Sequence, residues 1–399
     1  MKRSVDRILT THVGSLPRPD DLVELYRDDA PDSKLLPRLK SAIADIVRKQ
    51  HDAGVDVAND GEFGKAMRRA MDFGAWWSYV YDRLGGYELR EEQAKKGRAA
   101  WTFGSKERKD FAEFYAAEAS AAQSSANARQ SGTSTARLYG LMCNAPVKYT
   151  GHAAIQRDIQ NLRAAVGEKR AEDVFMTAVS PATLQILPNE YYKSPEEYTW
   201  ALAEAIRDEY RAITDAGFIL QIDDPALVDI YDWWFSLKGD LAGYRKWAAF
   251  QVEAVNHALE GIPEDRVRFH ICWGSWHGPH QGDVQLKDVV DLLLKVKAQA
   301  YVIEAGNVRH EHEWKVWKDT KLPQGKILIP GVVSHATNVL EHPELVADRL
   351  VRFARVVGRE NVIAGTDCGL GGRVHRQIAW AKLAALSEGA KLATKELWA

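Results

Sequence analysis

The sequence is poor in cysteine and has no excess of charge of either sign. Only three of the 399 residues are cysteines, an odd number in a long chain, which argues against a disulfide framework. The 53 Lys and Arg residues nearly balance the 55 Asp and Glu residues, and no long basic run occurs. This composition lacks the electrostatic footprint for nucleic acid or for an anionic membrane surface, so we expect neither as a partner.

Long apolar runs are also missing. None approaches the roughly 20 residues that a membrane-spanning helix needs. The polar start of the chain, residues 1–6, lacks the apolar core of a secretory signal. We therefore expect a cytoplasmic protein.

Short β-branched and apolar runs alternate with longer stretches of helical periodicity, which is typical of βα units around a parallel sheet. The predicted strands are 8–13, 55–59, 173–179, 218–222, 267–272, 300–303, 327–333 and 361–366. The clearest helices between them are 35–53, 194–216, 241–259, 286–298, 343–357 and 375–392. Eight such units predict a TIM (β/α)8 barrel. A doubly wound open sheet is the competing fold, but no GxGxxG follows the first strand, so a dinucleotide site is not indicated.

One stretch does not fit the alternation. Residues 73–137 contain an aromatic cluster, a charged segment and an Ala/Ser-rich end at 116–135. We interpret 1–399 as a single barrel domain and 73–137 as a partly helical insertion after strand two. Composition does not decide whether the Ala/Ser-rich end is helical or disordered.

The predicted strands end in polar residues, and in a TIM barrel those ends form the active-site rim. The sharpest subset is His270, Cys272, Glu304 and Cys368. Side chains two apart in a strand point the same way, so His270 and Cys272 can address one centre. Two thiolates, an imidazole and a carboxylate suit Zn²⁺ rather than magnesium or calcium.

Other polar residues have simpler explanations. Asp60, Asp224 and Asp367 could equally cap the helices that follow them. Cys143 matches no ligand spacing, and we expect it to fill the core. Four further histidines lie past the strand ends, where we expect a solvated surface or the rim of a substrate site: His277, His280, His310 and His312.

At these residues the sequence resembles the catalytic barrel of cobalamin-independent methionine synthase, and its shorter single-barrel relatives that include epoxyalkane:coenzyme M transferase. The resemblance runs from Thr10 to about Ala390, apart from the insertion. Six motifs appear in order: Thr-Thr-His-Val-Gly-Ser-Leu-Pro (10–17), Asp-Gly-Glu-Phe-Gly (60–64), Gln-Ile-Asp-Asp-Pro-Ala-Leu (221–227), His-Ile-Cys-Trp-Gly (270–274), Gly-Val-Val-Ser-His (331–335) and Asp-Cys-Gly-Leu (367–370).

The resemblance implies a role for each matching position, in a TIM barrel of the methionine synthase and uroporphyrinogen decarboxylase-like type. His270, Cys272, Glu304 and Cys368 match the zinc ligands of the family. His335 falls near its proton-donating histidine. The residues that hold the amino-acid part of homocysteine match Val13, Gly14, Ser15, Glu62 and Asp223.

Two departures from the family pattern bear on the methyl donor. Asp224 stands where methionine synthases usually carry Glu, and their folate-contacting segment is not recognisable in residues 180–186. Folate is therefore a less supported partner than the thiol. The sequence does not fix the oligomeric state, and it allows a homo-oligomer.

The expected function is zinc-dependent transfer of an alkyl group, methyl first, to a small-molecule thiol that is activated as a zinc thiolate. Homocysteine is the leading acceptor, and thiol addition to an epoxide is the alternative. A non-catalytic barrel that keeps zinc for stability is a third hypothesis, because four protein ligands also satisfy a structural site. A uroporphyrinogen decarboxylase-like enzyme needs no zinc, so the His-x-Cys motif argues against it.

Overall fold

A parallel sheet forms the centre of the molecule. The computed structural model describes residues 1–68, 76, 79–90, 104–124, 140–167 and 174–399. Seven of its strands pair in the order β1-β9-β8-β7-β6-β5-β4, and every pair is parallel. These strands are β1 (Leu9–Thr10), β4 (Phe175–Val179), β5 (Ile219–Asp223), β6 (Val267–His270), β7 (Ala300–Glu304), β8 (Ile327–Val333) and β9 (Ile363–Thr366).

The eighth position of the sheet is filled by only two residues. Val57 makes a parallel bridge to Thr11 beside β1, and Ala58 makes one to Val174 beside β4. Residues 57–58 therefore join the two ends of the strand order, and the sheet closes into the TIM barrel that the sequence predicts. All eight predicted strand segments take part in it.

Alternate residues of the strands face two different cores. Ala300 and Val302 of β7 pack inside the barrel with inward residues of β8 and β9, whereas Tyr301 and Ile303 pack in the outer core against the helices. The inner core also contains Arg268, which is fully buried and stacks 3.9 Å from the centroid of the Phe175 ring. This alternation fixes which side chains reach the carboxyl ends of the strands.

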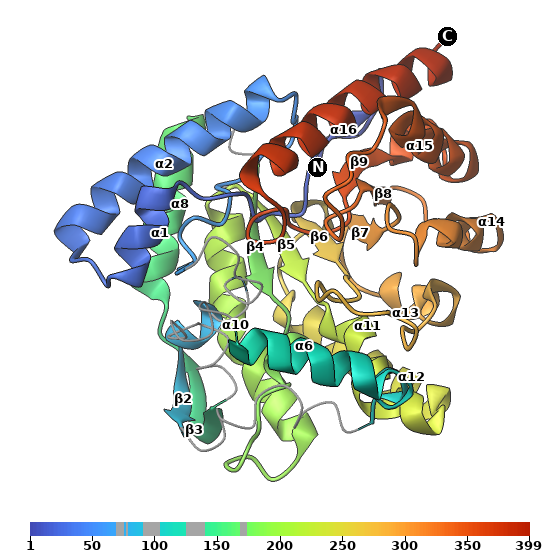
Figure 1. The fold of residues 1–399 in the computed structure, drawn as a ribbon. Coiled ribbons are helices and arrows are strands. Elements are labelled where there is room, and N and C mark those ends of the chain that lie inside the picture. Colours follow the sequence, from blue (N-terminus) through green and yellow to red (C-terminus); the bar gives the residue numbers. More distant parts are fainter. Residues whose placement is uncertain (69–75, 77–78, 91–103, 125–139, 168–173) are drawn as a thin grey trace.

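Helices surround the barrel (Figure 1). The longer ones are α1 (Asp20–Arg27), α2 (Asp32–Asp52), α8 (His152–Val166), α10 (Pro195–Asp215), α12 (Leu241–Ala258), α15 (Pro343–Val357) and α16 (Arg376–Leu397). Shorter α-helices are α9 (Pro181–Leu184), α11 (Ala226–Ile230), α13 (Val290–Leu293) and α14 (Val316–Asp319). The Ser194 side chain caps α10 by accepting from the Glu197 N–H, with Pro195 at the first helical position, as the sequence predicts.

One predicted helix is wrong in extent. The sequence predicts a helix over 286–298, but the structure has a 3-10 turn at Leu286–Asp288 and then the single turn of α13. Val289, between them, has φ −135°, which is not helical. The apolar residues there instead lie on successive short turns, which bury Leu286, Val289, Leu292 and Leu293.

A small subdomain lies between the second and third barrel strands. Its β2 (Leu84–Leu89) and β3 (Leu141–Tyr149) form an antiparallel pair that the sequence analysis did not predict. The helices α5 (Lys106–Asp110) and α6 (Ala112–Ser124) come between them in sequence. The predicted insertion at 73–137 lies partly outside the described residues.

The helices α5 and α6 are anchored to the loop that follows β6. The Glu107 carboxylate accepts hydrogen bonds from the backbone N–H groups of Gln281 (2.6 Å) and Gly282 (3.3 Å), and Trp276 donates to the Tyr115 hydroxyl. Figure 1 shows α6 lying across one end of the barrel. In the described part of the chain, no helix is long and apolar enough to cross a membrane.

Candidate metal centre

Three of the four predicted metal ligands meet at the carboxyl ends of the strands. His270 is the last residue of β6, Cys272 follows two residues later, and Cys368 follows the end of β9. All three side chains are buried, and one ligand atom from each lies within 4.8 Å of the others. The group is therefore compact enough to hold one metal ion.

Glu304, the fourth predicted ligand, is the last residue of β7 and is 3% exposed. One carboxylate oxygen accepts a 2.8 Å hydrogen bond from the Trp273 N–H, and the other accepts from the Asn307 side chain. The negative charge of Glu304 raises the pKa of Cys272 and of His270, after larger contributions from their nearer neighbours. Glu304 thus lies beside the His/Cys group but is tethered by hydrogen bonds of its own.

The His270 ring is oriented by a carboxylate. Its Nδ1–H donates to Asp223 Oδ1 at 2.9 Å, and its Nε2 is buried without a hydrogen-bond partner among the described residues. Metal-binding histidines commonly have this arrangement, since the carboxylate fixes the tautomer and leaves the other nitrogen basic. The residues present therefore fit a metal ion.

The two thiols lie within hydrogen-bond distance of each other. Cys272 Sγ donates to Cys368 Sγ at 3.6 Å, and this hydrogen bond holds the pKa of Cys368 well below its usual value, with help from the positive charge of Arg373. The same interaction and burial raise the pKa of Cys272 well above its usual value. The pair is thus prepared to present a thiolate, the form that binds soft metals.

Several of the predicted substrate residues lie against one another or share a hydrogen-bond partner. Gln221 donates to the Val13 carbonyl and, at 2.6 Å, to Asp223. At Gly14, φ is +148°, and a Cβ there would lie 2.7 Å from Glu62 Oε1, so a larger residue would displace that carboxylate. Ser15, the third residue of this segment, is 6% exposed and accepts backbone hydrogen bonds from the turn that follows Cys368.

Glu62 is held in an uncommon conformation. It is 3% exposed and has φ +62°, which few non-glycine residues adopt. Its Oε1 accepts from Thr177 Oγ1 at 2.7 Å and lies 3.5 Å from Lys65 Nζ, whereas its Oε2 has no partner among the described residues. The sequence analysis missed Lys65, although it directly follows the Asp-Gly-Glu-Phe-Gly motif.

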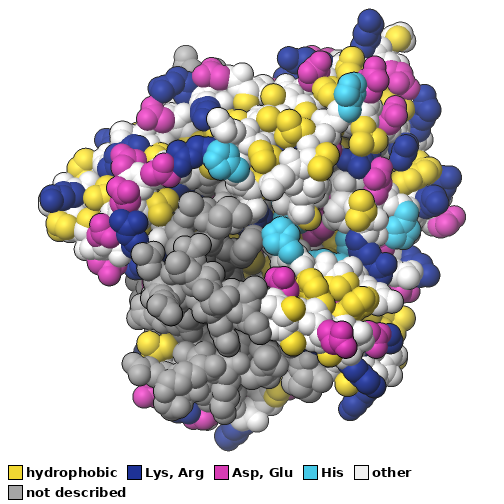
Figure 2. All heavy atoms as spheres, viewed as in Figure 1, with side chains coloured by type: hydrophobic (Ala, Val, Ile, Leu, Met, Phe, Trp, Pro, Cys, Tyr) yellow, Lys and Arg dark blue, Asp and Glu magenta, His cyan; other side chains and the backbone are white. Residues whose placement is uncertain are grey.

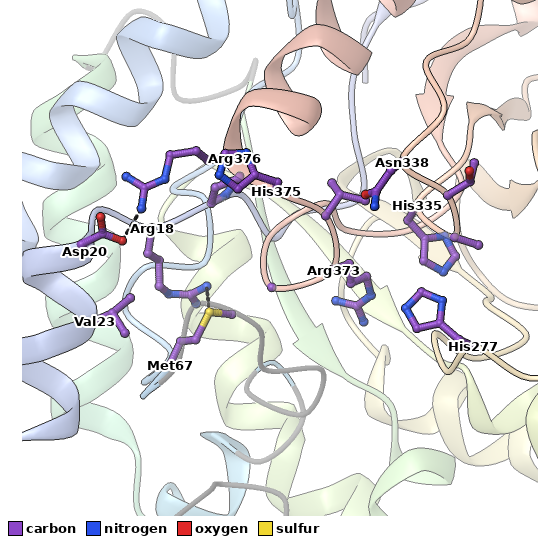
Figure 3. Close-up of a pocket in the computed structure, with 15 residues that line it drawn as sticks. Arg18, Asp20, Val23, Met67, His277, His335, Asn338, Arg373, His375 and Arg376 are labelled. Atoms are coloured by element: carbon purple, nitrogen blue, oxygen red, sulfur yellow. Dashed lines mark hydrogen bonds and ion pairs between the residues drawn. The ribbon is translucent and has the colours of Figure 1, made fainter. Parts of the chain in front are cut away.

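His335 lies two residues beyond β8 and is 3% exposed. Burial lowers its pKa, and its Nδ1 has no hydrogen-bond partner among the described residues. Figure 3 shows the imidazole beside Arg373 and His277 on the wall of a pocket. The lowered pKa favours the neutral imidazole, and one ring nitrogen is free of hydrogen bonds to the described residues.

Two of the loop histidines are not surface residues. His310 is 4% exposed and places its two ring nitrogens 3.0 Å from Asp283 and 2.9 Å from Glu313. His280 pairs with the same Asp283 at 3.1 Å. The prediction of a solvated surface position is thus wrong for His310, because paired carboxylates that sequence spacing does not show draw it inward. His277 and His312 are exposed.

The aspartates at the strand ends cap backbone groups. Asp224 Oδ1 accepts from the Leu227 N–H in α11, and Asp60 Oδ1 accepts from the Glu62 N–H. Asp367 Oδ1 accepts from the Ala305 and Gly306 N–H groups, both at 2.8 Å, and so holds the loop after β7. Cys143 is fully buried in the outer core.

Comparison with known proteins identifies the family. Residues 180–392, more than half of the chain, match the family described as "Cobalamin-independent synthase, Catalytic domain". The chain belongs to this family. It is a family of enzymes, and the matched residues include the predicted metal ligands and His335.

The similarity to curated relatives covers nearly the whole chain. A 2-hydroxypropyl-CoM lyase of Xanthobacter autotrophicus is 25% identical over 98% of this chain and 96% of its own length. A methionine synthase of Sulfurisphaera tokodaii is 26% identical over 97% of this chain and 93% of its own length.

The fold is shared with a solved enzyme. A B12-independent methionine synthase from Shewanella sp. W3-18-1, solved in complex with selenomethionine, superimposes with a TM-score of 0.68 and 20% identity. The superposition covers 98% of this chain and 99% of that one.

Proposed function

We propose that this protein catalyses the zinc-dependent transfer of an alkyl group, methyl first, to the sulfur of a small-molecule thiol. The observation that carries the proposal is the buried, unpartnered Nε2 of His270 in a group with two thiols. The carboxylate of Asp223 orients that imidazole. The donor set is one nitrogen and two sulfurs with a carboxylate nearby, which favours zinc over harder ions.

Zinc at this centre would lower the pKa of a bound thiol, so that the thiol attacks carbon as a thiolate at neutral pH. The chain supplies the rest. Cys272, Cys368 and His270 would hold the ion. Glu304 suits the position of a ligand that yields to the substrate, because Trp273 and Asn307 already satisfy both of its oxygens.

We assign the proton transfer to His335. Alkyl transfer releases one proton from the thiol and requires one at the leaving group, or at the oxygen of an opened epoxide. Burial lowers the pKa of His335, which favours the neutral imidazole, and a neutral imidazole can first accept a proton and then donate it.

Homocysteine is the leading acceptor. Glu62 Oε2 has no partner among the described residues, and the charge of Glu62 acts on Asp223, so the two carboxylates could together receive an ammonium group. The whole-length similarity to the 2-hydroxypropyl-CoM lyase favours a second candidate, the addition of a thiol to an epoxide. Lys65, beside Glu62, supports this candidate because its ammonium already offsets the charge of that carboxylate.

A thiol-consumption assay tests the proposal. The zinc-loaded protein is mixed with homocysteine, 2-mercaptoethanesulfonate or glutathione, each combined with methyl-folate, methylcobalamin, aryl methyl ether and epoxide donors. We expect zinc-dependent loss of one thiol with at least one donor, and product mass then separates methyl transfer from epoxide opening. If zinc is bound but no thiol is consumed in any combination, the result would instead support the hypothesis that zinc has only a structural role.

A further inference from the structure

A basic cavity opens beside the metal centre. It has a volume of about 900 Å³ and includes the rim residues His335 and Arg373 in its wall. Among the described residues that line it, Asp20 is the only carboxylate, and it pairs with Arg376. The lining residues that carry or can carry positive charge are Arg18, Arg373, Arg376, His277, His335 and His375. Figure 2 shows histidine and basic side chains on the face of the molecule drawn in Figure 1.

Arg373 differs from the other arginines of this cavity. Its guanidinium makes no hydrogen bond or ion pair with any residue that the structure describes, and its Nε is buried and unpartnered. By contrast, Arg18 donates to the backbone carbonyls of Glu62 and Lys65, and Arg376 pairs with Asp20. Arg373 is only 6% exposed. A buried guanidinium without an anion is unfavourable, so this one is suited to receive an anion from outside the chain.

The turn that carries Arg373 connects the predicted substrate segment to the metal centre. The N–H groups of Leu370 and Gly371 both donate to the Ser15 carbonyl at 2.9 Å. Cys368 lies five residues before Arg373, and the guanidinium charge acts on both Cys368 and His335. An anion bound at Arg373 therefore lies near both the sulfur atoms and the proposed proton carrier.

We propose that Arg373 binds the anionic group, a carboxylate or a sulfonate, of the thiol that is alkylated. A planar guanidinium with several N–H donors matches either group. The acceptor class is then a short thiol that carries an anion, and a neutral thiol is a poor substrate. This inference rests on the proposed function, and it names the substrate feature that the same site selects.

The test is direct binding to the zinc-loaded protein, measured by titration calorimetry with three thiols of similar size: 2-mercaptoethanesulfonate, 3-mercaptopropionate and 2-mercaptoethanol. Replacing Arg373 by Gln should lower the affinity for both anionic thiols by about 10- to 100-fold and change the affinity for 2-mercaptoethanol by no more than about twofold. Arg373→Lys should restore part of the affinity. Arg355→Gln is the matched control, because Arg355 is exposed, pairs with Glu396 and does not line the cavity, and this variant should bind all three thiols like the parent protein.

Each result is decisive. If Arg373→Gln retains zinc but binds the neutral and the anionic thiols equally more weakly, the proposal would be overturned. The guanidinium would then serve the charge balance of the metal centre. Unchanged binding of the anionic thiols would overturn it as well. If the zinc-loaded parent protein bound no thiol at all, the proposed function itself would fail, which is a separate outcome. Zinc content is measured for every variant, so loss of metal is not mistaken for loss of the anion site.

Discussion

Asp223 holds one nitrogen of His270 at 2.9 Å and leaves the other buried nitrogen without a partner in the described part of the chain. The relationship joins β5 to β6, which are neighbours in the barrel. It gives Asp223 a role that the family resemblance did not suggest, because that resemblance assigns Asp223 to the substrate.

Asp223→Ala should weaken metal binding. Without the carboxylate the imidazole loses its fixed orientation and some basicity, and the affinity for zinc should fall by about 10- to 100-fold. Competition with a chromogenic chelator measures this change. Asp223→Asn, whose amide oxygen can still accept from Nδ1, should lose less. An Asp223→Ala protein with the zinc affinity of the parent would show that Asp223 serves the substrate alone.

His335→Ala should keep its zinc and lose turnover. Proton transfer by a positioned side chain contributes about 10²- to 10⁴-fold, so kcat should fall by at least about 10²-fold. Metal analysis and steady-state kinetics on the same sample separate the two effects. His312→Ala, at an exposed position, provides the control. Full turnover in the His335 variant would remove this residue from the mechanism.

The network around Asp283 should make stability depend on pH. Burial alone would lower the pKa of His310, but its hydrogen bonds to Asp283 and Glu313 raise it to about 10. Because the pKa is higher in the folded state, protonated His310 stabilises the fold. This contribution is complete below the unfolded-state pKa of about 6.5 and is lost as pH rises toward 10. The difference in Tm between the parent and His310→Gln should therefore be large at pH 6 and shrink by pH 10. A difference that is constant over this range would contradict the assignment.

The strands and the chemistry at their ends could be predicted from sequence because both are local signals. Each strand is a short apolar run, and its polar end marks the rim of the barrel. His270 and Cys272 can reach one centre because they lie two positions apart, and the next strand ends at Glu304. Cys368 comes from the far side of the strand order, and only the closed barrel brings it within reach of His270.

The remaining features depend on contacts between distant segments. The burial of His310 follows from Asp283, which lies 27 residues away, and the unpaired state of Arg373 is a property of the folded cavity. The helix predicted over 286–298 fails because an apolar spacing of three and four residues also fits successive turns. The hairpin of β2 and β3 was missed because Gly85, Gly86 and Pro146 weaken its strand pattern.

Zinc content tests the central claim most directly. Purified parent protein, analysed by mass spectrometry after dialysis against metal-free buffer, should carry about one zinc per chain. The Cys272→Ser, Cys368→Ser double variant should carry almost none, while Cys143→Ser, which alters a cysteine outside the centre, should match the parent. Zinc retained by the double variant would contradict the metal centre, and with it the proposed function.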